Sequence, residues 1–163
     1  PQNAILVVAG GVTYAEAVRL AEKWFGPIPG GEPYRRALPQ EPRQTAARHL
    51  ETTADVPAAA LYKVWHMPGR ADLTGYYPAD LLSDVLGRGK SSRLYQALVQ
   101  KRRLFTSLSA SVTGTLDSGL LVVSGKVQAG VTLEEADAAV ADVIAHLRQD
   151  GVTDGELTKV RNQ

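Results

Sequence analysis

The residues most suggestive of chemistry lie in the segment 87–92, Gly-Arg-Gly-Lys-Ser-Ser. A Gly-Lys-Ser run at the start of a helix can hold a phosphate with its backbone N–H groups. The complete phosphate-loop pattern needs a glycine five positions before Gly89, where this chain has Asp84, and a strand rather than a helix before the loop. We therefore predict a tight turn between two helices, in which Gly89 supplies a positive φ and Ser91 or Ser92 caps the second helix.

Residues that could bind a metal or act as nucleophiles are few and scattered. The chain has three histidines, His49, His66 and His146, and no cysteine. The zinc-peptidase patterns H-x-x-E-H and H-E-x-x-H do not occur, and neither does the serine-hydrolase pattern G-x-S-x-G. We therefore interpret the histidines as structural or solvated. The chain is expected to contain no catalytic residue and no metal site, and its substrate-binding residues stay unknown.

Composition is typical of an ordinary globular domain. Of the 163 residues, 44% are hydrophobic and 21% are charged, which is enough apolar surface to form a core. The 18 basic and 17 acidic side chains leave a formal net charge of +1, so we expect no nucleic-acid partner. The apolar runs are far shorter than the roughly 20 residues that span a bilayer, and we expect no membrane span.

Hydrophobic spacing predicts the elements of the first third. Residues 4–9, Ala-Ile-Leu-Val-Val-Ala, form a continuous apolar run that is typical of a strand buried on both faces. A helix capped by Thr13 follows and stops at Gly26. Residues 26–44 are rich in Pro and Gly and predict an extended connection. Two strands are then predicted, over Thr45–Thr53 and Ala58–Met67.

The remaining two thirds combine helices with a hairpin. Helical spacing runs from Pro78 to Leu86, and a second helix carries Leu94, Tyr95, Leu98 and Val99. Alternating polar and apolar residues over 106–115, followed by an apolar run over 120–127, predict a β-hairpin. Two more helices begin at the caps Thr132 and Thr153. This order predicts an α+β fold, a two-layer sandwich of one largely antiparallel, mixed sheet covered by helices.

We expect residues 1–163 to form one domain that has been cut at both ends. Pro1 leads within three residues into a predicted strand, and Gln163 lies in a helical pattern with no stop signal after it. The strand and helix before residue 26 are too small to form a domain alone, so the connection over 26–44 is expected to link layers of the same domain.

Three stretches, taken in order, resemble the pitrilysin/insulinase family of zinc peptidases, which includes the mitochondrial processing peptidases. Residues 3–10, with the helix that ends in Trp-Phe-Gly-Pro-Ile-Pro, are similar to the start of the second domain of these proteins. Residues 86–95 are similar to the S-S-R-L segment of the family, and residues 156–163 also fit. The structural motif carried over from the second stretch consists of Gly87, Gly89, Ser91, Ser92 and Arg93.

The resemblance implies a fold and a role. Such proteins pair two similar α+β domains in each half and close two halves around an unfolded peptide. Their zinc lies in the other domain, on an H-x-x-E-H helix, so the resemblance implies a companion domain without a cofactor of its own. The implied partners are the preceding zinc-bearing domain of the same chain, a partner half or subunit of similar fold, and a peptide substrate. The resemblance alone suggests a bacterial periplasmic or envelope setting.

Two positions indicate which half of such an assembly the domain belongs to. Companion domains that assist catalysis carry an arginine and, seven residues later, a tyrosine after the S-S-R-L helix. This chain has Val99 and Thr106 at those places. The resemblance therefore implies the second domain of a zinc-bearing half rather than of the partner half.

The leading hypothesis is a non-catalytic domain of a zinc metallopeptidase, inactive alone, that forms part of the wall of a peptide-enclosing chamber. The chief alternative is a non-enzymatic interaction or assembly domain whose parent has lost the zinc motif. A nucleotide-binding module built on Lys90 is a more distant alternative, and a titration with ATP tests it.

We predict that the isolated chain binds no stoichiometric zinc. Three unclustered histidines and no cysteine cannot supply the usual three or four ligands. Metal analysis after dialysis measures this directly. About one tightly held zinc per chain would contradict the prediction.

Overall fold

The computed structural model describes residues 3–32, 37, 39 and 41–163. Contacts divide the chain into two compact units, residues 1–51 and residues 52–163. The expectation of a single domain over 1–163 stays a prediction. Residues 33–36, 38 and 40 of the predicted connection lie outside the described residues. Among the described residues, no helix combines the length and the apolar character needed to cross a bilayer.

The first unit contains helix α1 (Tyr14–Phe25). Thr13 begins it, since its side chain accepts a hydrogen bond from the Glu16 N–H, and the Gly26 N–H donates to the Glu22 carbonyl at its end. Both boundaries of the predicted helix are confirmed. None of its residues is buried.

Two predicted strands are wrong. Residues 4–9 and Thr45–Thr53 have no strand structure, and both stretches are exposed. In the first, Ile5 is 92% exposed and Val7 80%. A strand exists only where a neighbouring strand accepts and donates its backbone hydrogen bonds, and among the described residues neither stretch has such a neighbour. An apolar run predicts that a stretch is buried, but it does not show that a neighbouring strand is present to pair with it.

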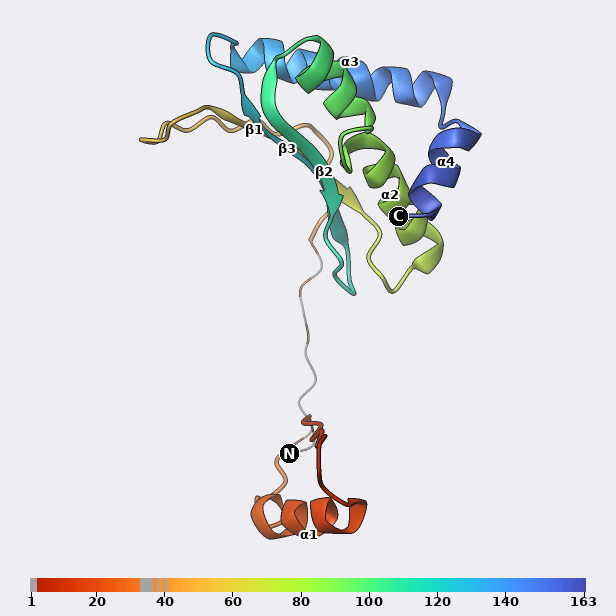
Figure 1. Ribbon diagram of the computed structural model, residues 1–163. Helices are drawn as coiled ribbons and strands as arrows, with labels where there is room; N and C mark the ends of the chain where they lie inside the picture. The colour runs from red at the N-terminus through yellow and green to blue at the C-terminus, as the bar shows by residue number, and fades with distance from the viewer. Residues whose placement is uncertain (1–2, 33–36, 38, 40) are drawn as a thin grey trace. The chain divides into compact units, whose positions relative to one another are not determined.

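The second unit is built on a three-stranded antiparallel sheet (Figure 1). Its strands are β1 (Ala60–Met67), β2 (Phe105–Val112) and β3 (Gly119–Val127), in the order β1-β3-β2. Val123 in the central strand pairs with Lys63 on one side and with Ala110 on the other. The predicted hairpin is confirmed, and β2 and β1 are the edge strands of this sheet.

Helices gather on one side of the sheet (Figure 1). They are α2 (Leu73–Gly87), the π-helix η1 (Tyr95–Lys101), α3 (Leu133–Asp150) and α4 (Asp154–Arg161). Thr132 and Thr153 cap α3 and α4 as predicted, and Thr153 forms a complete capping box with Glu156. The α+β fold class with a helix-covered antiparallel sheet is confirmed.

Helix α2 differs from its prediction at its start. It begins at Leu73, before Pro78, because the Asp72 side chain accepts a hydrogen bond from the Gly75 N–H and caps the helix there. Proline is favoured in the first turn of a helix, and the prediction placed it there. In the structure the carboxylate cap determines the start, and Pro78 lies inside the helix.

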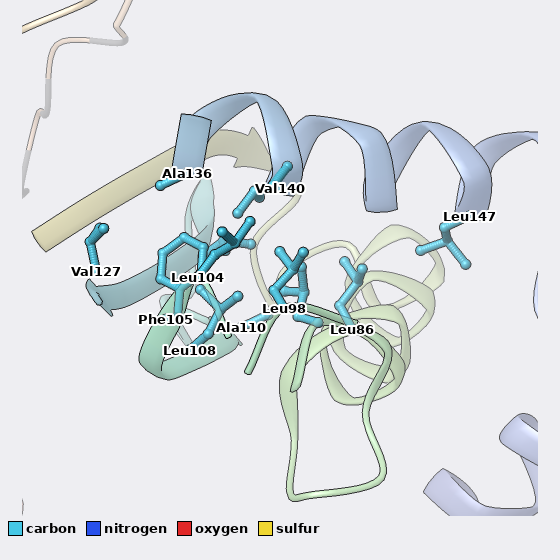
Figure 2. Close-up of a cluster of buried hydrophobic side chains, with 13 residues drawn as sticks. Leu86, Leu98, Leu104, Phe105, Leu108, Ala110, Val127, Ala136, Val140 and Leu147 are labelled. Atoms are coloured by element: carbon cyan, nitrogen blue, oxygen red, sulfur yellow. The ribbon is translucent and has the colours of Figure 1, made fainter. Parts of the chain in front are cut away.

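The core lies between the sheet and the helices (Figure 2). Phe105 and Leu108 of β2 project toward the helical layer, where Ala136 and Val140 of α3 cover them. Leu98 of η1 is fully buried beside them. The alternation that predicted a half-exposed β2 is confirmed, since Leu108 and Ala110 are buried whereas the alternating Ser107, Ser109 and Ser111 are exposed.

Gly87, the last residue of α2, makes the closest approach between the helical layer and the sheet. A Cβ atom on this residue would overlap the backbone nitrogen and the side chain of Ala110 in β2. Only glycine lets the helix lie this close to the strand.

We predict that Gly87→Ala lowers the free energy of unfolding by about 1–3 kcal/mol, because the added methyl group forces the helix away from β2. Gly155→Ala is the matched control. A Cβ at Gly155 meets nothing within 4 Å, and this residue lies in helix α4. Alanine there is expected to raise stability by about 0.5–1 kcal/mol. Urea unfolding of both variants checks the prediction, and equal effects would contradict it.

Candidate functional site

The segment that connects α2 to η1 is a compact turn. Gly89 has a φ of 75°, in the left-handed region that favours glycine. The Ser92 hydroxyl donates to the Gly89 carbonyl at 2.8 Å, and the Gln96 side chain donates to the Lys90 carbonyl at 2.6 Å. The predicted serine cap is therefore wrong. Ser92 is buried, and its hydroxyl bonds back to the turn instead of accepting a hydrogen bond from a backbone N–H of the next helix. Ser91 is exposed.

Arg93 joins this turn to the C-terminal helices. Its Nε donates to Glu156 Oε1 at 2.7 Å, and one terminal nitrogen donates to Glu156 Oε2 at 2.8 Å and to the Gly151 carbonyl at 2.7 Å. The guanidinium thus binds the carboxylate through two parallel bonds and the end of α3 through a third. A bidentate pair of this kind is stronger and more directional than a single ionic contact.

Glu156 is held from two sides. Besides Arg93, the N–H and the hydroxyl of Thr153 both donate to Glu156 Oε2 at 2.9 Å. These bonds, above all those from Arg93, lower the pKa of Glu156 from 4.5 to about 2. The hydrogen bond to Glu156 likewise raises the pKa of Arg93 above its ordinary value. The sequence predicted Arg93 as a motif residue and Glu156 as a cap, but it held no signal that pairs them across 63 positions.

Val99 packs against the core, whereas Thr106 is exposed. Val99 is partly buried and packs against the hydrophobic core, as predicted from its helical register with Tyr95. Thr106 is exposed, and its hydroxyl donates to the Lys126 carbonyl at 3.3 Å. It lies where the pairing of β2 with β3 shifts by one residue, so it is the extra residue of a β-bulge.

The histidines lie on the surface. His49, His66 and His146 are all exposed, and His146 Nδ1 lies 2.8 Å from the Asp142 carbonyl oxygen. Within the described part of the chain, no three His, Asp or Glu side chains come together.

A groove of about 580 Å³ runs between α2 and β2. On the helix side it is lined by residues spaced one turn apart, Tyr76, Asp80, Asp84 and Gly87 with their neighbours Ser83, Arg88 and Gly89. On the strand side the lining is formed by residues 109–112 and Gly114. Arg88 and Asp84 form an ion pair at 2.9 Å in this lining. No sequence pattern predicted the groove, since its two walls come from elements separated by the whole of η1.

Sequence comparisons relate the whole chain to zinc proteases. A family model described as the peptidase M16 inactive domain matches residues 1–163. The chain is 26% identical over 167 residues to the zinc protease PqqE of Helicobacter pylori, covering 99% of this chain and 37% of that protein. It is also 26% identical over 169 residues to an uncharacterized zinc protease of Bacillus subtilis, covering 100% of this chain and 38% of that one. The chain thus spans little more than a third of these relatives.

Solved structures show the same fold. A protease from Helicobacter pylori superposes with a TM-score of 0.73 at 23% identity, covering 91% of this chain and 37% of that one. A peptidase M16 inactive domain from Pseudomonas fluorescens gives a TM-score of 0.56 at 22% identity, covering 66% of this chain and 26% of that one.

We predict that the contact between Arg93 and Glu156 stabilises the fold at neutral pH and is lost in acid. Because the folded-state pKa of about 2 lies below the ordinary 4.5, the stabilisation is complete above pH 4.5 and disappears as the pH falls toward 2. Glu156→Gln keeps a capping side chain but removes the charge, and it should cost about 1–3 kcal/mol at pH 7.

Urea unfolding of both proteins from pH 7 to pH 2.5 measures this, and the difference between them should shrink across that range. The matched control is Glu135→Gln, at the same position of the Thr132-capped helix α3, where no arginine bonds to the side chain in the described contacts. An equal loss of stability in the two variants, or a difference that does not change with pH, would show that the charge of Glu156 is unimportant.

Proposed function

Because the chain belongs to the family of peptidase M16 inactive domains, we propose that it serves a zinc metallopeptidase as a companion domain that forms part of the wall around a peptide substrate. The observation that carries the proposal is the match of the inactive-domain model to residues 1–163, together with the relatives that are named zinc proteases. The zinc and the catalytic residues would then belong to another domain, and this chain would be inactive alone.

The polar interactions of the chain fit a structural role. Arg93 and Glu156, the best-connected charged pair, bond to each other and to backbone groups of the C-terminal helices. A rigid helical layer of this kind suits a domain that must hold its shape while a peptide moves past it. The proposed partners are a zinc-bearing domain of the same protein and a second half or subunit of similar fold.

Val99 and Thr106 support a place in the zinc-bearing half. A side chain that stabilises the charge developing on a substrate carbonyl must donate a hydrogen bond or carry a positive charge. Valine does neither, and Val99 packs against the core. The Thr106 hydroxyl is short and donates to the Lys126 carbonyl. Groups that assist the reaction from across the chamber would therefore come from the partner half.

We predict that in the intact parent protein Val99→Ala lowers stability by about 1–3 kcal/mol but leaves turnover per folded molecule unchanged. Thr106→Ala should leave both activity and folding nearly unchanged. Peptide cleavage by the parent, with zinc measured alongside, checks the function, and cleavage should require the partner half. A parent that holds no zinc and cleaves no peptide would favour the alternative of an assembly domain. Full activity without any partner, or loss of activity in folded Thr106→Ala, would contradict the assignment to the zinc-bearing half.

A further inference from the structure

Helix α1 has an apolar face that the described residues leave uncovered. Its apolar side chains recur three or four positions apart and so form one stripe along the helix, while charged residues such as Arg19 and Glu22 lie on the opposite face. The stripe consists of Tyr14, Ala17, Val18, Ala21, Trp24 and Phe25. None of these residues is buried, and Trp24 is 65% and Phe25 54% exposed.

The rest of the first unit shares this exposure. Among residues 3–32, 37, 39 and 41–51 none is buried, and Ile5 and Val7 expose most of their side chains. A chain of this length buries too little apolar surface to fold without a further partner. A helix of 12 residues is likewise only marginally stable in water unless a neighbour covers its apolar face. Helix α1 therefore requires a surface on which to pack.

The length of the matched relatives indicates where that surface lies. The chain spans 37% of the zinc protease of Helicobacter pylori and 38% of the Bacillus subtilis relative, so most of such a protein lies outside residues 1–163. The solved Helicobacter pylori structure covers 91% of this chain, which is more than residues 52–163 comprise, so its likeness in fold extends into the first unit. A fold that includes residues of the first unit thus occurs in a longer chain, which has room for another domain to cover α1.

We propose that the apolar face of α1 packs on another folded domain of the parent protein, with Trp24 and Phe25 at the centre of the contact. The inference rests on the proposed function for the existence of that domain, which would be the zinc-bearing one. Contiguous exposed apolar surface marks an interaction site on a soluble protein, and tryptophan is among the residues that contribute most to such contacts. The Lys23 ammonium lies 4.7 Å from the centroid of the Trp24 ring, a cation–π contact that restricts the rotation of the indole.

Hydrogen exchange, measured by mass spectrometry on the intact parent and on the isolated 163-residue chain, tests the proposal. A helix that packs on a neighbour exchanges its amide hydrogens slowly, whereas an uncovered helix of 12 residues frays. We expect the amides of α1 to exchange about tenfold more slowly, or slower still, in the parent than in the isolated chain. The amides of the central strand β3 should exchange slowly in both samples, which verifies that residues 52–163 are folded in each.

Two substitutions test the apolar face itself. Trp24→Gln and Phe25→Gln place a polar side chain in the stripe without lowering helix propensity, and each should speed the exchange of α1 in the parent about tenfold or more. The matched control Arg19→Gln introduces the same side chain on the charged face of the helix and should leave the exchange unchanged. In the isolated chain none of the three variants should alter the exchange of α1, because nothing covers the helix there.

Equal exchange of α1 in the parent and in the isolated chain would overturn the proposal, as would equal effects of Arg19→Gln and Trp24→Gln. Slow exchange of α1 in the isolated chain would also overturn it, because the helix would then pack within this chain or, if the protection rises with concentration, on a second copy. Zinc content and peptide cleavage are measured on the same parent. A parent that protects α1 but neither binds zinc nor cleaves peptide would contradict the proposed function alone, so the two failures are distinguishable.

Discussion

The contact of Gly87 with Ala110 is the constraint on which the second unit depends. It places the end of α2 directly against β2, and because the helix is rigid this contact fixes the position of its whole inner face. The turn over residues 88–92 must then start at the sheet surface and return toward the core, where Leu94 and Leu98 are fully buried. The same contact sets the distance between α2 and β2 along the groove, so it determines the geometry of both the groove and the core.

The pair formed by Arg93 and Glu156 extends this arrangement to the end of the chain. Arg93 follows the turn directly, and its bonds to Glu156 and to the Gly151 carbonyl attach α3 and α4 to the segment that α2 positions. Shifted pKa values often mark catalytic groups, but ion-pair networks shift them as well. Here each partner is the main cause of the other's pKa shift. Because the bonds between them hold helices together, these pKa shifts indicate a structural role.

Features that depend on residues close together in the sequence were predicted, whereas features that depend on residues far apart in the sequence were missed. Helix starts at Thr13, Thr132 and Thr153 were predicted because one threonine hydroxyl and one backbone N–H three residues later suffice to form them. The hairpin was predicted because polar alternation and turn residues lie within a single stretch. The strand over residues 4–9 failed because a strand needs a partner that the run itself does not specify. At the candidate site the motif residues were found, but neither the partner of Arg93 nor the groove was, since both join residues far apart in the sequence.

These observations separate two kinds of polar residue in a domain that belongs to an inactive-domain family. Arg93, Glu156 and Ser92 of the helical layer are bonded within the fold and thereby restrict its motion. Tyr76 and Asp80 line a groove on the α2 helix that Gly87 holds in place, and no buried side-chain polar atom in the described structure lacks a partner. Polar groups at an accessible groove can exchange hydrogen bonds with water, whereas buried polar groups must find their partners within the fold.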